Sequence, residues 1–263
     1  MRGRVVPALC QSGAMYQKAT HYKSEILSSS WPQRQILKIK ADECQKVVAN
    51  WYMSERSVKD LFPNNMTLDY PRRAVIFFQG SPADVIYWLG KGIVDLYRPT
   101  NDGNPLLRMA GPGEIIGYVD SFDKNGNLVH AYEARARTHC QVILLTRQNI
   151  NNVLQTLERT KLIELLWHLN RAWSEEALRW IILTTSDCRQ RLKLAVADLA
   201  ARFGARDARG ILLVPEVSHQ DFANLVGCSR AMASRLIVEM IEAGDLVREG
   251  GHYIVANGSE LAT

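Results

Sequence analysis

The fold follows from residues 219–236, which read His219-Gln-Asp-Phe-Ala-Asn-Leu-Val-Gly-Cys-Ser-Arg-Ala-Met-Ala-Ser-Arg-Leu236. Phe222, Leu225 and Val226 recur at helical spacing and give a first helix one apolar face. Gly227 comes next, where a tight turn requires a positive φ, which glycine adopts at the lowest cost. The pattern predicts a short helix that ends in a sharp turn.

A second helix is predicted directly after the turn. Ser229 is a suitable N-cap, because its hydroxyl can accept a hydrogen bond from an unpaired backbone N–H, and Gly244 is a suitable end. The apolar stripe between them contains Leu236, Ile237, Met240 and Ile241, whereas Arg230 and Arg235 lie off it. We interpret the pair as a helix-turn-helix whose second helix enters the major groove of DNA. The alternative is an ordinary pair of packed helices with solvated arginines.

A hairpin is predicted after the second helix. Two short apolar runs in residues 245–255 flank Gly250 and Gly251, which is the pattern of two strands joined by a tight turn. A hairpin in this place is typical of a winged helix. Residues 187–203 are predicted as a further helix with Gly204 as its cap, and residues 211–214 as a short strand.

Composition limits the class of protein. The first 50 of the 263 residues hold eight Lys or Arg and three Asp or Glu, and the rest of the chain holds 24 of each, so the net charge of +5 arises in the first 50 residues. DNA affinity of the C-terminal part must then come from a few well-placed arginines. No apolar run is long enough for a membrane span, and we expect a cytoplasmic protein. The five cysteines are too far apart for a local zinc or iron–sulfur site.

Short apolar segments alternate with turn residues between residues 66 and 145. Strands are predicted at 66–70, 74–78, 85–91, 93–99, 105–109, 114–116, 132–137 and 140–145. Regular short strands favour an antiparallel sandwich or jelly roll. We therefore expect an α+β protein with a basic extension over residues 1–50, and a jelly-roll-like sensor domain with flanking helices over 51–158. A long helix over 159–186 and a winged helix-turn-helix over 187–263 complete the chain.

The long helix carries a heptad repeat. Its seam comprises Leu162, Leu166, Leu169, Trp173, Glu176, Trp180 and Leu183, the spacing of an a/d interface. A second apolar stripe contains Leu165, Ile181 and Ile182. We predict that one stripe faces the sandwich and the other faces a partner helix in a homodimer, which suits a palindromic DNA site. The alternative is a helix that packs only on its own sandwich.

The order of strands, long helix and winged helix-turn-helix resembles the cyclic-AMP receptor and fumarate–nitrate regulator (Crp–Fnr) family of bacterial transcription factors. Gly-Cys-Ser-Arg at 227–230 and Arg-Leu at 235–236 resemble its recognition helix. Gln79-Gly80, Lys91-Gly92, Gly103 and the run Pro112-Gly-Glu-Ile-Ile-Gly117 resemble its glycine-punctuated β-roll. The resemblance covers about residues 55–257 and implies a sequence-specific regulator with double-stranded DNA, a second copy of itself and RNA polymerase as partners.

The chain departs from this family at the nucleotide pocket. By the resemblance, Tyr118 stands where an acidic residue follows Gly117, and His130-Ala131 where Arg-Ser would hold the cyclic phosphate. Glu176-Ala177 stands where Thr-Ser would contact adenine. A histidine and a methyl group cannot replace a bidentate guanidinium and a hydroxyl, so we predict no cyclic-AMP binding. The pocket is then empty, filled by its own side chains, or adapted to another effector. Trp173, Trp180 and Tyr118 would give it an aromatic character, and the alternative is that these side chains only pack in the core.

The resemblance also assigns the DNA-contacting residues. Arg230 and Arg235 are the expected base readers, through guanine O6 and N7, and Ala231 can touch a thymine methyl group. Ser218, His219 and Gln220 are placed for phosphate contacts at a helix N-terminus. Ser229 and Ser234 complete the candidate surface.

Two other functions remain open on the sequence alone. One is a metal-dependent enzyme of the cupin kind on the β-roll, although the six histidines include no close pair and no catalytic motif or metal site is predicted. The other is a ligand-binding module that acts through protein contacts. We predict a protein that is not an enzyme and has no cofactor.

Overall fold

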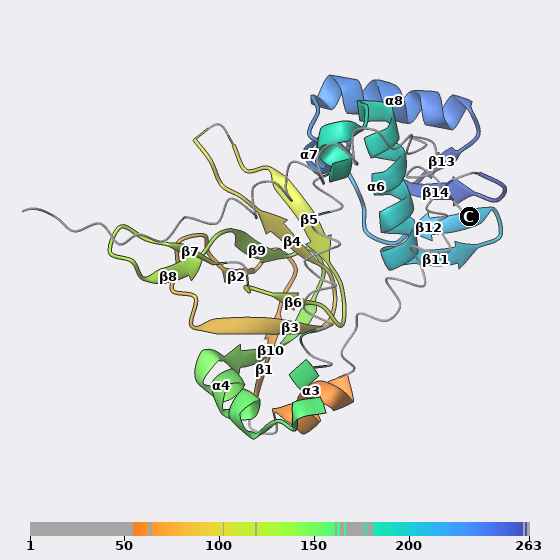
Figure 1. Cartoon of the computed structure of the whole chain (residues 1–263). Helices are drawn as coiled ribbons and strands as arrows, with labels where there is room; N and C mark the ends of the chain where they lie inside the picture. The colour runs from red at the N-terminus through yellow and green to blue at the C-terminus, as the bar shows by residue number, and fades with distance from the viewer. Residues whose placement is uncertain are drawn as a thin grey trace, which may run out of the picture. The chain divides into compact units, whose positions relative to one another are not determined.

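The computed structural model describes residues 55–62, 65–101, 103–118, 120–160, 162–163, 166, 177, 181–259 and 261. The predicted basic extension lies outside these residues, as do Trp173 and Glu176. Helices and antiparallel strands combine in the α+β architecture that the sequence predicts (Figure 1). None of the helices that the structure describes has the length and apolar character of a membrane span.

Two four-stranded antiparallel sheets form the β-roll. One has the order β1-β10-β3-β6 and consists of Met66–Tyr70, Cys140–Thr146, Val85–Lys91 and Ile115–Ile116. The other has the order β2-β9-β4-β5 and consists of Val75–Phe77, Glu133–Ala136, Val94–Tyr97 and Leu106–Ala110. All eight correspond to predicted strands, with bounds that differ by at most two residues.

The core of the roll draws on both sheets. Leu89 and Val142 come from the first sheet and Val94 and Ala134 from the second, and all four are completely buried in one cluster. Burial of such aliphatic side chains stabilises the fold by roughly 1.5–3 kcal/mol for a residue the size of Val or Leu. The two sheets therefore share one hydrophobic interior, as a jelly-roll-like sandwich requires.

A small hairpin was not predicted. β7 (Asp120–Phe122) pairs with β8 (Leu128–His130) around the turn at residues 123–127. The Asp123 carboxylate accepts hydrogen bonds from the backbone N–H groups of Asn125 and Asn127, both at 2.8 Å. The turn was recognisable from its Asn and Gly residues, but each strand is only three residues long and Phe122 is 70 % exposed, so no buried alternation marks them.

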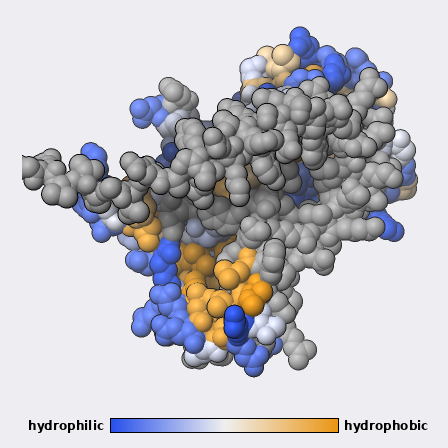
Figure 2. Space-filling model, viewed as in Figure 1, coloured by the Kyte–Doolittle hydropathy of each residue, from blue (hydrophilic) through white to orange (hydrophobic). Residues whose placement is uncertain are grey.

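Two helices cover the outer face of the first sheet. α3 (Glu55–Leu61) contributes Val58 and α4 (Arg147–Thr156) contributes Ile150 to a cluster with Trp88 on β3. Thr146 caps α4 by accepting a hydrogen bond from Asn149 N, and both helices lie within the region where flanking helices were predicted. Figure 2 shows apolar surface, in orange, in the region where Figure 1 draws α3 and β3.

The predicted long helix is described only in part. Residues 159–160, 162–163, 166, 177 and 181–185 are helical, which agrees with a helix in this part of the chain. Ile163, Leu166 and Ile181 are 45 %, 56 % and 50 % exposed. Large apolar side chains therefore lie on the surface of a single copy of this chain.

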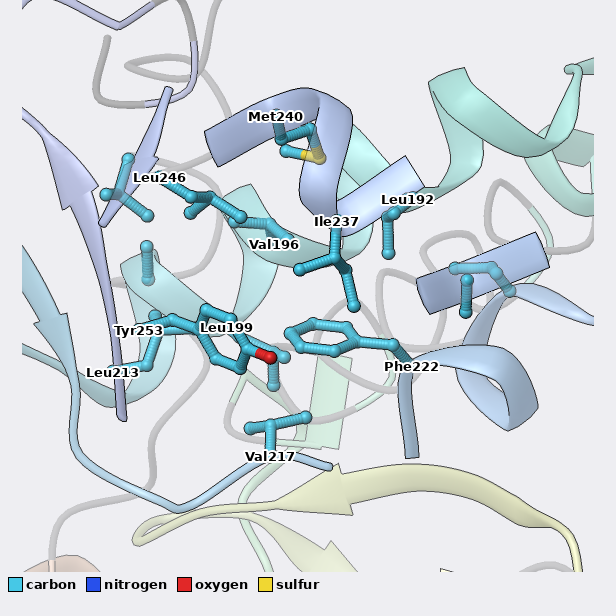
Figure 3. Packing of buried hydrophobic residues seen from close by; sticks show 14 of the residues in the cluster. Leu192, Val196, Leu199, Leu213, Val217, Phe222, Ile237, Met240, Leu246 and Tyr253 are labelled. Carbon is cyan, nitrogen blue, oxygen red and sulfur yellow. The ribbon is translucent and has the colours of Figure 1, made fainter. Parts of the chain in front are cut away.

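The C-terminal part contains three helices and a four-stranded sheet. α6 (Cys188–Phe203), α7 (His219–Val226) and α8 (Arg230–Glu242) accompany the strands β11 (Gly204–Asp207), β12 (Gly210–Leu213), β13 (Leu246–Glu249) and β14 (His252–Ala256), in the order β11-β12-β14-β13. Figure 3 shows the rings of Phe222 and Tyr253 in the middle of their shared core, surrounded by aliphatic side chains of α6 and α8. These two rings meet edge to face with centroids 5.6 Å apart.

Gly204 ends α6 where a glycine cap was predicted, but for a different reason. Its φ of −80° is not left-handed, and the residue begins strand β11, which was not predicted. A Cβ atom there would lie 2.2 Å from Ala200 O and 2.3 Å from Ile211 Cγ2. Gly204 is therefore required by the close approach of helix and strand rather than by its backbone angle.

Candidate nucleic-acid interface

The turn between α7 and α8 is fixed by local hydrogen bonds. Ser218 and Asp221 form a capping box, in which Ser218 Oγ accepts from Asp221 N and the Asp221 carboxylate accepts from Ser218 N. Gly227 adopts φ 64° and ψ 49°, which confirms the predicted left-handed turn. Ser229 caps α8 by accepting from Met232 N. These contacts are encoded within a few residues, which explains why the motif could be recognised in the sequence.

The recognition face of α8 lies opposite its buried face. Ala233, Leu236, Ile237 and Met240 are buried in the core, whereas Arg230, Ala231 and Arg235 are exposed. Gly244, with φ 80°, follows the end of the helix as predicted. The surface over α8 is mostly hydrophilic in Figure 2. The helix therefore presents two cationic side chains outward from a rigid support.

The second arginine of this face is held only by weak local contacts. The Arg235 side chain is 65 % exposed, and its Nε lies 3.9 Å from Glu239 Oε1. Its Nη2 lies 3.0 Å from Met232 Sδ. Exposed ion pairs of this kind contribute at most about 1 kcal/mol, so Arg235 can exchange them for a hydrogen-bond acceptor on another molecule.

The three candidate residues at the start of α7 do not share one orientation. Ser218 and Gln220 are exposed, and the Gln220 amide donates to Asn224 Oδ1 at 2.9 Å on the same helix. The His219 ring lies partly buried, with Nδ1 2.7 Å from Ser234 Oγ and Nε2 2.8 Å from Tyr253 Oη. Both nitrogens of His219 are thus engaged within the protein, which sequence spacing did not predict.

The wing adds a cation that the sequence analysis did not select. Gly250 and Gly251 have φ angles of 55° and 90°, as a two-residue hairpin turn requires. The exposed Arg248 lies on β13 just before this turn, with its guanidinium 5.8 Å from the centre of the Tyr253 ring. Arg248 could have been selected from the sequence, because it lies two residues before the Gly250-Gly251 turn of the predicted hairpin. Arg230 and Arg248 line one cleft of about 940 Å³ together with Ser218.

Arg137 ties α7 to the roll. Its Nε donates to Asp95 Oδ1 at 2.7 Å, its Nη2 lies 3.3 Å from Asp221 Oδ2, and its Nη1 donates to the backbone oxygen of Glu216. Burial raises the pKa of Asp95, although the charge of Arg137 opposes that rise. The capping-box carboxylate of Asp221 is thus shared between the start of α7 and a cation of the roll.

Aromatic rings pack around two of the candidate effector residues of the roll, Gly117 and His130. The buried His130 ring stacks on Phe77 with centroids 4.1 Å apart, and Tyr87 stacks on Phe77 at 5.2 Å. Tyr132 accepts a hydrogen bond from Gly117 N at 2.7 Å. A Cβ atom on Gly117 would lie 3.2 Å from both His130 Cε1 and Tyr87 Cδ2. The rings therefore pack directly against the glycine at which the family's pocket was located.

Sequence reasoning selected only part of this pocket. Gly117 and His130 are buried within it, and Tyr118 and Ala131 are partly buried near it in the chain, whereas Ala177 is exposed on the long helix. Phe77, Tyr87 and Tyr132 were missed, because they come from β2, from β3 and from the residue before β9, and they meet only where the two sheets pack together. In the described part of the chain, no group of three or more His, Cys, Asp or Glu residues is arranged to hold a metal ion.

Comparisons with known proteins agree with this architecture. Residues 67–157 match the model described as "Cyclic nucleotide-binding domain", and residues 216–242 match "Bacterial regulatory proteins, crp family". A "CRP-like cAMP-activated global transcriptional regulator" of Mycobacterium tuberculosis is 24 % identical over 197 residues, covering 74 % of this chain and 86 % of that protein. The "CRP-like protein Clp" of Xanthomonas euvesicatoria is 26 % identical over 202 residues, covering 72 % and 83 %.

A solved structure shows the same fold. The c-di-GMP responsive global regulator CLP of Xanthomonas campestris superposes with a TM-score of 0.61 at 23 % identity, covering 76 % of this chain and 98 % of that one. At this identity the similarity establishes the arrangement of β-roll and helix-turn-helix. The relative from Mycobacterium tuberculosis is named as a transcriptional regulator.

Proposed function

Because this chain belongs to the Crp–Fnr family of DNA-binding transcription regulators, we propose that it reads a palindromic DNA site as a homodimer through the exposed face of α8. One observation carries the proposal. Arg230 and Arg235 project from a helix whose other face is anchored in a hydrophobic core. A guanidinium on such a helix can donate two hydrogen bonds to guanine O6 and N7.

The positions of these residues on α7 and α8 suggest which of them contact bases and which contact phosphates. Arg230, Arg235, Ala231 and Ser234 lie where a helix in the major groove meets base edges, and Ser218, Gln220 and Ser229 lie where backbone phosphates pass helix N-termini. Arg248 of the wing extends the phosphate-contacting surface. Since the C-terminal part has no excess of basic residues, we expect affinity to depend on these few cations. A regulator of this kind acts in the cytoplasm together with RNA polymerase.

Selection of bound sequences from a random pool tests the proposal. The selected site should contain two inverted half-sites about one helical turn apart. Arg230→Ala should then cost about 1–3 kcal/mol of binding free energy and relax one base position. Arg98→Ala is the matched control, because it removes the same charge from an exposed position on the roll. Recovery of no common sequence, or an equal loss for both variants on all sequences, would refute specific reading by α8.

The homodimer rests on the long helix. Ile163, Leu166 and Ile181 are exposed in a single copy, and burial of such side chains against a partner helix is favourable at roughly 25 cal/mol per Å². Leu166→Lys should convert a dimer into monomers, as measured by sedimentation equilibrium. A wild-type protein that sediments as a monomer at micromolar concentration would contradict this part of the proposal.

We also propose that cyclic AMP does not control this protein. The support is the stack of Phe77, Tyr87 and His130 against Gly117, which fills the region where the family holds the cyclic phosphate. Isothermal titration with cyclic AMP should give no saturable heat, and DNA affinity should not change when the nucleotide is added. Saturable binding would show that the rings move aside. No observation on the described residues specifically favours an enzyme or a module acting through protein contacts.

A further inference from the structure

His219 connects three elements of the DNA-binding part through one side chain. It is the first residue of α7, its Nδ1 lies 2.7 Å from Ser234 Oγ on α8, and its Nε2 lies 2.8 Å from Tyr253 Oη on β14 of the wing. The partners are 15 and 34 residues away in the sequence. A single imidazole therefore spans the first helix, the recognition helix and the wing.

Both partners are held in defined positions. Tyr253 is 2 % exposed, and its ring meets Phe222 edge to face inside the core. Ser234 lies on α8 between the buried Ala233 and the exposed Arg235. A hydroxyl can both donate and accept, so the Ser234 and Tyr253 hydroxyls can satisfy a neutral imidazole in either tautomer.

The surroundings of His219 favour that neutral form. Burial lowers the pKa of His219, and the positive charges of Arg248 and Arg230 lower it further. A neutral ring has one N–H to donate and one nitrogen to accept, and both are used by Ser234 and Tyr253. A phosphate would have to displace one of these contacts in order to bind His219.

We propose that His219 is a positioning residue for DNA recognition: it fixes the Ser234 hydroxyl and the relative placement of α8 and the wing, and so contributes to sequence specificity without contacting a phosphate. This inference rests on the proposed reading of DNA by α8. It replaces the expectation that His219 contacts a DNA phosphate, as its neighbours Ser218 and Gln220 are expected to do. In this role, the two hydrogen bonds of His219 hold α8 and the wing in place from the protein side of the recognition surface.

The test compares binding to a selected specific duplex and to a random duplex. A net hydrogen bond contributes about 0.5–1.5 kcal/mol, which corresponds to about a two- to tenfold change in affinity. His219→Ala should reduce specific binding by about that factor for each lost bond and should change random-duplex binding much less. A phosphate contact would instead weaken binding about uniformly across sequences. Gln220→Ala supplies this reference, because Gln220 is exposed at the same helix end.

Two conservative variants separate the two bonds. The amide nitrogen of an asparagine side chain reaches the place of Nδ1, and that of a glutamine reaches the place of Nε2. His219→Asn should therefore keep the Ser234 bond, His219→Gln should keep the Tyr253 bond, and each should recover part of the specificity lost in His219→Ala. His219→Ala combined with Ser234→Ala should cost less than the sum of the two single changes, because both remove the same bond.

The outcomes distinguish this inference from the proposed function. If Arg230→Ala leaves the preference for the selected duplex unchanged, reading by α8 is itself wrong. If Arg230→Ala abolishes the preference but His219→Ala weakens both duplexes equally, the positioning role is overturned. Additive losses in the double variant would also overturn it. Thermal unfolding of each variant identifies a loss of fold, and the asparagine and glutamine variants keep the test decisive if the alanine variant does not fold.

Discussion

Replacement of Glu114 by glutamine should destabilise the protein by about 3 kcal/mol at neutral pH. Glu114 Oε2 accepts from Arg108 Nη1 at 2.5 Å, and Oε1 accepts from Gly111 N at 2.8 Å and from Arg202 Nη2. Arg108 belongs to the roll and Arg202 to α6. One carboxylate therefore forms ion pairs with two cations from different parts of the fold.

The magnitude follows from the protonation equilibrium of this carboxyl group. Burial alone would raise the pKa of Glu114, but the charges of Arg202 and Arg108 and the hydrogen bonds from Arg108 and Gly111 lower it from 4.5 to about 2. A tenfold change in a dissociation constant is worth about 1.36 kcal/mol, which gives about 3 kcal/mol in favour of the folded state. Loss of one partner from a buried ion pair has a cost of similar size, about 3–5 kcal/mol.

The pH dependence has a definite sign. Because the pKa of Glu114 is lower in the folded state, its contribution is complete above about pH 4.5 and is lost as the pH falls toward 2. Urea unfolding monitored by tryptophan fluorescence should show a difference of about 3 kcal/mol between wild type and Glu114→Gln at pH 7. That difference should shrink steadily below pH 4.5.

Glu249→Gln is the matched control for the free energy of unfolding. Glu249→Gln removes the same charge from a side chain that is 62 % exposed and paired with Arg209 on the surface, so it should change stability much less. Equal stability of wild type and Glu114→Gln at pH 7, or a difference that stays constant down to pH 3, would refute the assignment of stabilising charge to Glu114.

Three further outcomes are expected. Gly204→Ala should shift the urea midpoint downward, because its Cβ would lie 2.2 Å from Ala200 O; an unchanged midpoint would show that α6 and β11 can accommodate the methyl group. Asp187→Ala should destabilise α6 by about 1 kcal/mol, measured by thermal unfolding, because it removes the cap on Gln190 N. Burial and a neighbouring thiol raise the pKa of Cys228 to about 11. Alkylation of Cys228 by iodoacetamide at pH 8 should therefore be much slower in folded than in urea-unfolded protein. Equal rates at this residue would show that its thiolate is reactive in the folded protein.

The DNA-binding motif could be predicted because its determinants are local. Gly227, Ser229 and the apolar stripe of α8 act over three or four residues, and the structure has each of them in its predicted role. The strands of the roll were predicted for the same reason, since their bounds lie at Gly, Pro and Asn turns. The β7–β8 hairpin was missed because its strands are short and largely solvated.

Contacts between distant residues could not be predicted from one sequence. The same spacing that placed His219 at a helix N-terminus could not show that its ring turns toward Ser234 and Tyr253. Likewise, the sequence could not show which side chains surround Gly117. Phe77 and His130 meet only because β2 and β8 approach each other in the folded roll. Such features depend on tertiary packing, which periodicity does not encode.

The ring stack against Gly117 has a consequence for the stability of the roll. A bound nucleotide lends its host stability in proportion to the logarithm of its concentration, so the host weakens when the metabolite runs short. In contrast, the rings of Phe77, Tyr87 and His130 are part of the chain, so the stability that their packing contributes does not depend on the concentration of a ligand. Under the proposed independence from cyclic AMP, the packing of these rings contributes the same stability to the roll at every concentration of the nucleotide.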